Sequence, residues 1–240
     1  MRDFHRRLLK KSLHGTRREI QKNRLGFIEM THLKRQKIPK NWPINRKGTK
    51  YVVTPNFKGL PILIILRDIL KLAQNRKEVK KALHAGHILL NEKIVKDEKN
   101  SALLFDVITN IPAKENYRIE LSDKGKFKVE KVSEAGKKIA KIMNKKTLRG
   151  KKIQLNLSDG RNVLSDVKCN VGDSVLISFK ENKIEKCLGL KEKAKVIIIA
   201  GKHAGTQGVI RKLKLERKMA SVISNGEDIN VLIKQLMVIE

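Results

Sequence analysis

Apolar residues are spaced along this chain in two ways, and each spacing predicts a different kind of element. Residues 60–73, LPILIILRDILKLA, are apolar almost all round a helical period, and Pro61 stands where a helix would begin. We therefore predict a buried helix over Leu60–Ala73. The next segment, RKEVKKALHAG, predicts a shorter helix that Gly86 closes at its C-terminal cap.

The shorter helix has two different faces at about 100° per residue. One face, about 100° wide, carries four basic side chains: Lys77, Lys80, Lys81 and His84. The other face carries Val79, Ala82 and Leu83. Glu78 is the helix's only acid, whereas solvated faces usually mix both signs. The basic face is thus a candidate binding surface. Arg67 and Lys71 on the preceding helix extend it, and we expect Asp68 to form a structural ion pair.

Alternating patterns after this helix predict short strands. HILLNEKIV reads as strand–turn–strand with its bend at residues 91–93, and 117–121 with 127–129 form a hairpin around Ser-Asp-Lys-Gly. Residues 152–157 and 161–164 predict a second hairpin, and VLISF a further strand. Ser133–Lys146, in contrast, predicts a brief helix with Ser133 as its N-cap.

The last segment, KVIIIAGKHAGTQGVIRKLK, is the most distinctive in the chain. An apolar strand enters a loop with Gly201, Gly205 and Gly208, and more strands follow around Asn225-Gly226. Five short strands here suggest an SH3-like barrel. The spacing does not match the nucleotide-binding GxxxxGK[ST] loop, because Lys202 follows Gly201 directly and a strand comes next. We expect the glycines to allow close approach to an RNA backbone, with Lys202 and His203 contacting phosphates.

The net positive charge of the chain indicates which class of partner it binds. Its 55 Lys+Arg and 24 Asp+Glu give a net charge of +31, and residues 1–50 contribute +13 of it (16 Lys+Arg, 3 Asp+Glu). A chain this basic needs a polyanion to neutralise it, most often nucleic acid or an anionic membrane. The longest apolar run is far below the ~18 residues of a membrane-spanning helix. With only 4% aromatic residues, contacts to RNA should rely on phosphates more than on stacked bases.

The sequence offers no credible catalytic site and no sign of a cofactor. The six histidines are dispersed among basic stretches, and Cys169 and Cys187 have no CxxC partner, so a metal site or a disulfide framework is not expected. Unpaired cysteines favour a reducing, cytoplasmic compartment. The aspartates sit near turns, where they commonly bond their own backbone.

Three segments together resemble one known family. THLKRQKIPKNWPI, the segment from LPILIILRDILKLA to KEVKKALHAGHILLNEKIVKD, and KVIIIAGKHAGTQGVIRKL are similar to the S4e family of small-subunit ribosomal proteins, over about residues 30–240. The resemblance implies an α+β protein with a basic N-terminal arm, an αα-turn-β RNA-binding module of S4 type, a small central β domain and a C-terminal SH3-like KOW β-barrel. The corresponding ranges are 1–29 (extension), 30–59 (arm), 60–114, 115–190 and 191–240.

The resemblance also implies which residues contact RNA. In the arm these are His32, Lys34, Arg35, Lys37 and Lys40. In the S4-type module they are Arg67, Lys77, Lys80, Lys81, His84 and Lys93, and Lys202 lies in the KOW loop. Lys71 and His203 are expected to contact RNA from the basic pattern itself. Gly86, Gly201, Gly205 and Gly208 are assigned to turns.

The sequence departs from the family pattern at four places. TPNFKG lacks the family's Gly-Pro-His stretch, Glu92 replaces a hairpin Gly, and Ser158 replaces a His. The family normally begins near Met30, so residues 1–29 are either an extension or an upstream mis-called start.

The function we expect is structural: binding and stabilising small-subunit rRNA beside neighbouring ribosomal proteins, without a small-molecule substrate or a membrane. Two alternatives are an RNA-modifying enzyme and a KOW transcription factor. The first needs a further catalytic domain, for which the modules leave no space. The second needs an acidic or apolar surface for polymerase, whereas the positive charge here spreads over every module.

Overall fold

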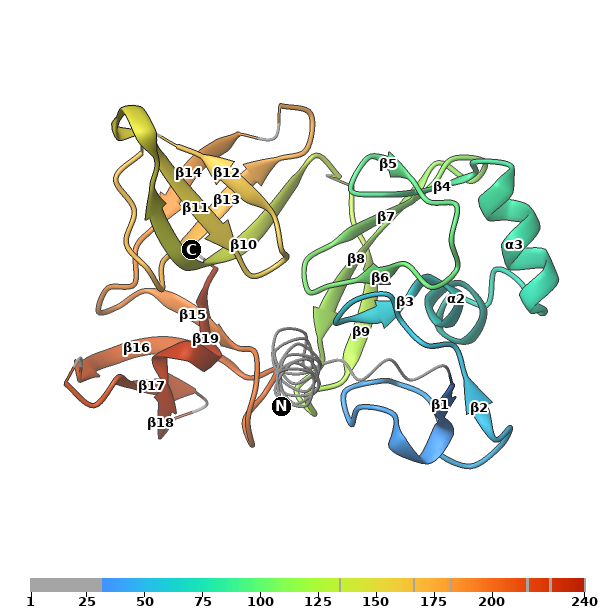
Figure 1. Ribbon diagram of the computed structural model, residues 1–240. Coiled ribbons are helices and arrows are strands. Elements are labelled where there is room, and N and C mark those ends of the chain that lie inside the picture. The colour runs from blue at the N-terminus through green and yellow to red at the C-terminus, as the bar shows by residue number, and fades with distance from the viewer. Residues whose placement is uncertain are drawn as a thin grey trace, which may run out of the picture.

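The computed structural model describes residues 32–133, 135–165, 167–181, 183–214, 216–224 and 226–239, so the extension expected over residues 1–29 lies outside the described part. The described chain is mostly β-structure with few helices. Its main elements are three five-stranded antiparallel sheets, accompanied by two short strand pairs (Figure 1).

The arm folds back on itself before the first sheet. β1 (Leu33–Lys34) pairs with β2 (Tyr51–Val52), with a 3-10 turn at Arg35–Lys37 between them. β3 (Leu60–Pro61) pairs with β6 (Ser101–Ala102). Trp42 in the arm is 3% exposed and belongs to the core that the helices and the first sheet share, so the arm is part of the folded body.

The apolar helix is shorter than predicted. Residues 60 and 61 are used as strand β3; α2 covers only Ile62–Ile64, and a π-helical turn follows over Ile65–Ile69. The helix ends at Leu70 because Lys71 has a left-handed backbone (φ 53°), so the predicted end at Ala73 was wrong. The expected burial is confirmed, since all residues from 60 to 66 are buried.

The basic helix is present where the sequence predicts it. α3 spans Arg76–His84 and begins with a capping box formed by Asn75 and Glu78. Gly86 adopts φ +74°, and its N–H donates to the carbonyl of Leu83. A left-handed residue after the cap is the usual way for a helix to end, so the assignment of Gly86 to this turn is confirmed.

The first sheet has the strand order β5-β4-β7-β8-β9. Its strands are β4 (Ile88–Leu90), β5 (Lys93–Ile94), β7 (Val107–Asn110), β8 (Glu115–Leu121) and β9 (Phe127–Lys131). The hairpin bend predicted at residues 91–93 is confirmed: Asn91 and Glu92 both have positive φ, so the turn forms without the family's glycine. The sheet runs across the expected domain boundary at residues 114/115, since β7 pairs with β8.

The second sheet has the order β12-β11-β10-β13-β14. Its strands are β10 (Lys137–Thr147), β11 (Ile153–Leu157), β12 (Asn162–Leu164), β13 (Ser174–Ser178) and β14 (Ile184–Leu188). The helix predicted over Ser133–Lys146 was wrong, because most of this segment is β10. Lys138, Ala140 and Ile142 point alternately into the interior, and β13 and β11 pair with successive halves of the strand.

The third sheet has the order β18-β17-β16-β15-β19. Its strands are β15 (Lys195–Ile198), β16 (Gln207–Lys214), β17 (Met219–Ser224), β18 (Glu227–Leu232) and β19 (Leu236–Val238). The five strands predicted from the sequence are therefore present. A 3-10 turn at Ile233–Gln235 leads into β19, and the side chains of Ile197 and Met237 join the core of the first sheet.

Candidate RNA-binding surface

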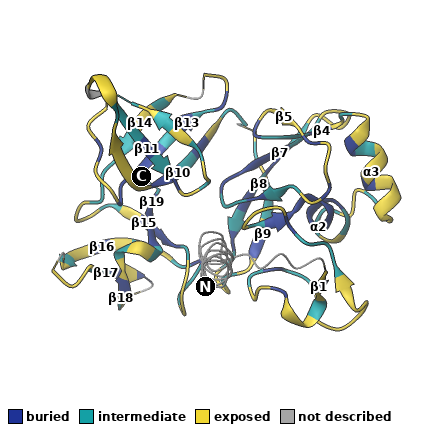
Figure 2. Ribbon diagram, viewed as in Figure 1, coloured by how far each residue is buried: buried dark blue, intermediate teal, exposed yellow. Residues whose placement is uncertain are grey.

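The two faces of α3 separate in the structure as predicted. Val79 and Leu83 are fully buried, whereas all four basic side chains on the other face are exposed. Figure 2 shows the outer side of this helix as exposed. Burial of the apolar side holds the helix in place, so the positions of Lys77, Lys81 and His84 are set by the core beneath them.

The single acid of α3 does not neutralise this face. The carboxylate of Glu78 accepts hydrogen bonds from the backbone N–H groups of Gln74 (2.8 Å) and Asn75 (3.4 Å). These bonds hold the pKa of Glu78 below its ordinary value, because they favour the charged form. Its charge is therefore placed at the helix N-terminus, where it also complements the helix dipole.

A second carboxylate fixes α3 to the rest of the module. Glu98 is only 4% exposed and accepts hydrogen bonds from Arg76, with Nε at 2.9 Å, while Lys80 Nζ lies 3.7 Å away. The guanidinium of Arg76 holds the pKa of Glu98 below its ordinary value. Lys80 is thus partly engaged by protein, unlike the other lysines predicted on this face.

The three cations expected to extend this surface are placed differently from one another. Arg67 makes an ion pair with Asp68 (2.8 Å), which confirms the structural pair predicted for that aspartate. Lys71 is exposed just after the helix end. Lys93 is exposed on β5, whose neighbouring residue Ile94 lies beside Gly86 at the end of α3.

In the arm, Arg35 has a structural role. Its guanidinium donates to the carbonyls of Thr49 (2.8 Å) and Asn45 (2.9 Å) and to the Thr49 hydroxyl (2.8 Å), which closes the loop between β1 and β2. The other cations predicted in the arm remain exposed: His32, Lys34, Lys37 and Lys40.

Two of the glycines predicted in the loop between β15 and β16 are required by protein contacts. Gly205 lies in the loop, but Gly208 is part of strand β16 and pairs with Val196, so its assignment to the loop was wrong. A Cβ on Gly205 would lie 1.9 Å from the carbonyl oxygen of Ser122, in the turn between β8 and β9. One on Gly208 would lie 2.4 Å from the carbonyl of Ile223 in β17. The close approach at both positions is thus to protein backbone and not, as we expected, to RNA. Gly201 has φ +99°, which suits its assignment to the turn.

The predicted residues do not form one continuous site. Lys202 is exposed and His203 half-buried in the loop that packs on the β8–β9 turn. α3 lies at one edge of the molecule, whereas the third sheet lies on its other side (Figure 1). The structure therefore presents separate basic patches, joined through a folded body.

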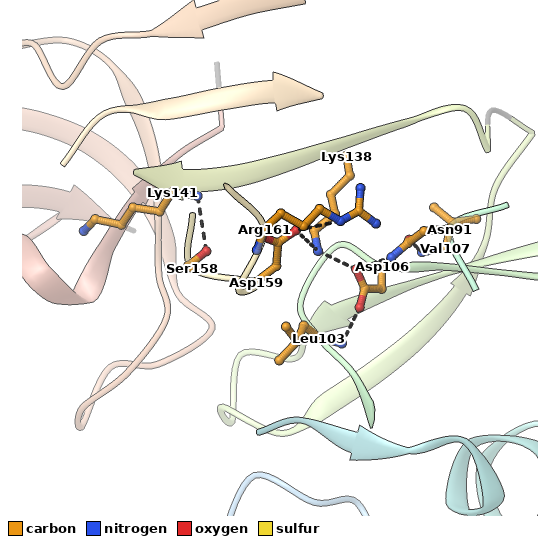
Figure 3. A network of polar contacts seen from close by, with 9 residues as sticks. All are labelled: Asn91, Leu103, Asp106, Val107, Lys138, Lys141, Ser158, Asp159 and Arg161. Carbon is orange, nitrogen blue, oxygen red and sulfur yellow. Dashed lines mark hydrogen bonds and ion pairs between the residues drawn. The ribbon is translucent and has the colours of Figure 1, made fainter. Parts of the chain in front are cut away.

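Two lysines that sequence reasoning counted only as positive charge are buried between the sheets. Lys138 of β10 is 3% exposed; its Nζ lies 2.5 Å from Asp106 Oδ1, next to the first sheet, and 3.1 Å from Asp159 Oδ2, in the β11–β12 turn (Figure 3). Asp106 also accepts hydrogen bonds from the Asn91 side chain and the backbone of Leu103. We call the contacts of Lys138 with the two aspartates the junction.

Lys141, three residues further along β10 and on the opposite face of the strand, joins the second sheet to the third. Its ammonium donates to the carbonyls of Ile233 and Leu236, each at 2.5 Å. Desolvation lowers the pKa of Lys141 to about 8. The Ser174 hydroxyl adds a further link by accepting from the N–H of Val238 at 2.9 Å. Alternation along β10 is the signal that would have identified Lys138 as internal, because it shares a face with Ala140 and Ile142. Lys141 lies on the opposite face, and no alternation marks it as buried.

Other chemistry is sparse in the described part of the chain. The described residues contain no group of three or more His, Cys, Asp or Glu side chains arranged to hold a metal ion. Cys169 and Cys187 are free thiols, although their side chains interact across the core of the second sheet; burial raises the pKa of Cys187 to about 12. No helix among the described residues is long and apolar enough to cross a membrane.

Comparison with known proteins supplies the family. Residues 113–184 match the model of ribosomal family S4e, and residues 30–57 match the RS4NT (NUC023) domain. The small ribosomal subunit protein eS4 of Methanocella arvoryzae is 38% identical over 79% of this chain and 83% of its own length. That of Archaeoglobus fulgidus is 38% identical over 84% and 88%.

A solved structure agrees with these sequence relatives. The crystal structure of the 30S ribosomal protein S4e from Thermoplasma acidophilum matches with a TM-score of 0.65 at 28% identity, covering 75% of this chain and 94% of that one. Its resemblance extends over all but a small part of the Thermoplasma chain. Together with the relatives that are 38% identical, it shows that this chain belongs to the S4e family of ribosomal proteins.

Proposed function

We propose that the chain is a structural constituent of the small ribosomal subunit, where it binds and stabilises folded rRNA during translation. The observation that carries this proposal is the basic face of α3. Its lysines are exposed and held by a buried apolar side, and the helix's only acid is turned to its N-cap. An exposed cationic helix face, one of several separate basic patches, fits a binding role better than an enzymatic one.

The mechanism is electrostatic. Lysine and arginine side chains neutralise phosphates and release condensed counterions, so RNA helices can approach one another on the protein. Recognition then depends on RNA shape and backbone, because the chain has few aromatic side chains to stack on bases. No small-molecule substrate, cofactor or membrane enters this mechanism, and the partners are small-subunit rRNA and neighbouring ribosomal proteins in the cytoplasm.

Two modules of the chain contribute to RNA binding. α2, its π-helical turn, α3 and the β4–β5 hairpin correspond to the αα-turn-β S4-type RNA-binding module, and the strands β15–β19 to the KOW barrel. Support for the first comes from the succession of two helices and a hairpin, with Lys93 on the hairpin. For the second it comes from five antiparallel strands and a glycine-containing loop that exposes Lys202.

The salt dependence of RNA binding tests the proposal. Replacing Lys77, Lys80 and Lys81 together by Ala should lower the slope of log affinity against log salt by about 2–3 units, because each neutralised phosphate contributes ~0.7–0.9. The measurement is filter binding of the purified chain to small-subunit rRNA over a salt series.

A matched control removes the same net charge elsewhere. Lys128, Lys131 and Lys137 are exposed lysines that pair with Glu130, Glu115 and Glu185. The triple Ala variant of these three should keep nearly the slope of the unaltered chain. Equal slopes for both triple variants would show that the α3 face is only a solvated surface.

A further inference from the structure

A cavity of about 360 Å³ lies between the arm and the helices. The arm contributes the strand residues around Tyr51, and the helical segment contributes Leu63, Ile64 and Arg67. The volume is at the lower end of the ~300–1,000 Å³ typical of ligand sites. It suits one small planar group with a substituent and is too small for a nucleic-acid duplex.

The lining of this cavity contains several cationic side chains. Arg35, Arg67, Arg76 and Lys99 all contribute to it, and no acidic residue is among the described residues that line it. Asp68 and Glu98 hold the guanidiniums of Arg67 and Arg76 from outside the cavity. Because a guanidinium has five N–H donors, a paired arginine keeps donors for a further anion. The arrangement is therefore preorganised for a phosphate.

The remaining lining combines aromatic and apolar side chains with Thr49 and Thr54. Tyr51 is 48% exposed, its ring centroid lies 5.4 Å from that of His32, and the Lys50 ammonium lies 5.5 Å from the Tyr51 ring. Leu63 and Ile64, both almost fully buried, also line the cavity. A free phosphate makes no use of an aromatic ring, and an apolar ligand makes no use of four cations. A nucleotide uses both.

We propose that this cavity receives a single unpaired nucleotide of the bound RNA, with its base against Tyr51 and its phosphate against Arg67, Arg76 and Lys99. The inference rests on the proposed function, since it names the RNA element that one surface of the chain selects. The nucleotide must be unpaired, because a base in a duplex has both faces stacked and cannot reach a side chain. The proposed contact with Tyr51 is a base–aromatic contact on a surface that otherwise contacts RNA phosphates.

The test separates stacking from charge neutralisation. Tyr51→Ala should weaken binding of the full chain to small-subunit rRNA about tenfold, the usual loss for one base–aromatic contact. The slope of log affinity against log salt should stay unchanged, because an uncharged ring releases no counterions. Tyr51→Phe keeps the ring and should bind as the unaltered chain does. Phe57→Ala is the matched control, since Phe57 is 46% exposed but does not line the cavity.

The inference is overturned if Tyr51→Ala binds like the unaltered chain, or if Tyr51→Ala and Phe57→Ala weaken binding equally. Failure of the proposed function looks different: the unaltered chain itself would then show no salt-dependent binding. Ultraviolet crosslinking of native small subunits tests the same inference without any variant. We expect mononucleotide adducts on Tyr51 or His32, and adducts confined to other residues of the chain would also overturn the inference.

Discussion

Lysines on α3 and lysines on β10 have the same chemistry and opposite surroundings. Lys81 on α3 is exposed, whereas Lys138 and Lys141 on β10 are 3% and 4% exposed and contact other sheets. An exposed ammonium keeps its water and stays available to a phosphate. A buried one loses that water and must be compensated by carboxylates or carbonyls. Net charge alone therefore overstates how much of the chain faces RNA.

The largest effect in this comparison is expected at the junction. Lys138→Met leaves Asp106 buried without its cation and Asp159 with only the more distant Arg161 (3.5 Å), which should lower the free energy of unfolding by roughly 3–5 kcal/mol. Urea denaturation of the purified chain measures it. Adding Asp106→Asn should recover part of the loss, because one uncompensated charge is removed. A loss below about 1 kcal/mol for Lys138→Met would show that the aspartates are solvated without the lysine.

A smaller effect with its own pH signature is expected at Lys141. Its folded pKa of about 8 lies below the ordinary 10.5, so between these values the unfolded chain holds more protons. The free energy of unfolding should therefore rise with pH from about 8 towards 10.5 through this group, and below pH 8 the cost of burying the charge is fully present. In Lys141→Met, the part of this pH-dependent rise in the free energy of unfolding that comes from Lys141 should be absent.

At pH 7 we expect Lys141→Met to cost about 1 kcal/mol, because two carbonyls lose their donor while a buried charge is removed. Unfolding curves at pH 7 and pH 9.5 for both proteins check the sign. Identical pH dependence in the two proteins would contradict the assignment of the lowered pKa to Lys141.

The smallest effect on stability is expected on α3. Lys81→Met changes an exposed position above a buried helix side, so the free energy of unfolding should shift by no more than ~0.5 kcal/mol. The same urea titration used for Lys138→Met provides the measurement. A loss as large as that at the junction would place Lys81 in a structural role and remove it from the proposed RNA-binding face.

Local sequence patterns were sufficient to predict those features of the fold that depend only on neighbouring residues. Gly86 at the end of α3 and the hairpin bend at residues 91–93 were predicted from neighbouring residues. The capping box of Asn75 and Glu78 is equally local, but it was not predicted. The exposed side of α3 follows from the same helical period. Its lysines are placed by Val79 and Leu83 underneath.

The predictions were wrong or missing where residues far apart in the sequence determine the structure. Residues 137–147 contain lysine and alanine, which suit helices, yet pairing with β13 and β11 makes them a strand. The partners of Lys138 lie 32 residues before it, at Asp106, and 21 after it, at Asp159. The cavity beside Tyr51 likewise joins the arm to segments around residues 63 and 99. A pattern of neighbouring residues cannot predict these contacts between segments that are far apart in the sequence.

The order in which the chain is made matters for the contacts of Lys141. The carbonyls that satisfy its ammonium belong to residues 233 and 236, some ninety positions later, in the turn before β19 and at its first residue. Until those residues are available, a lysine in the middle of β10 has no internal acceptors. Docking of the third sheet onto the second through Lys141 therefore cannot precede synthesis of residues 233–236.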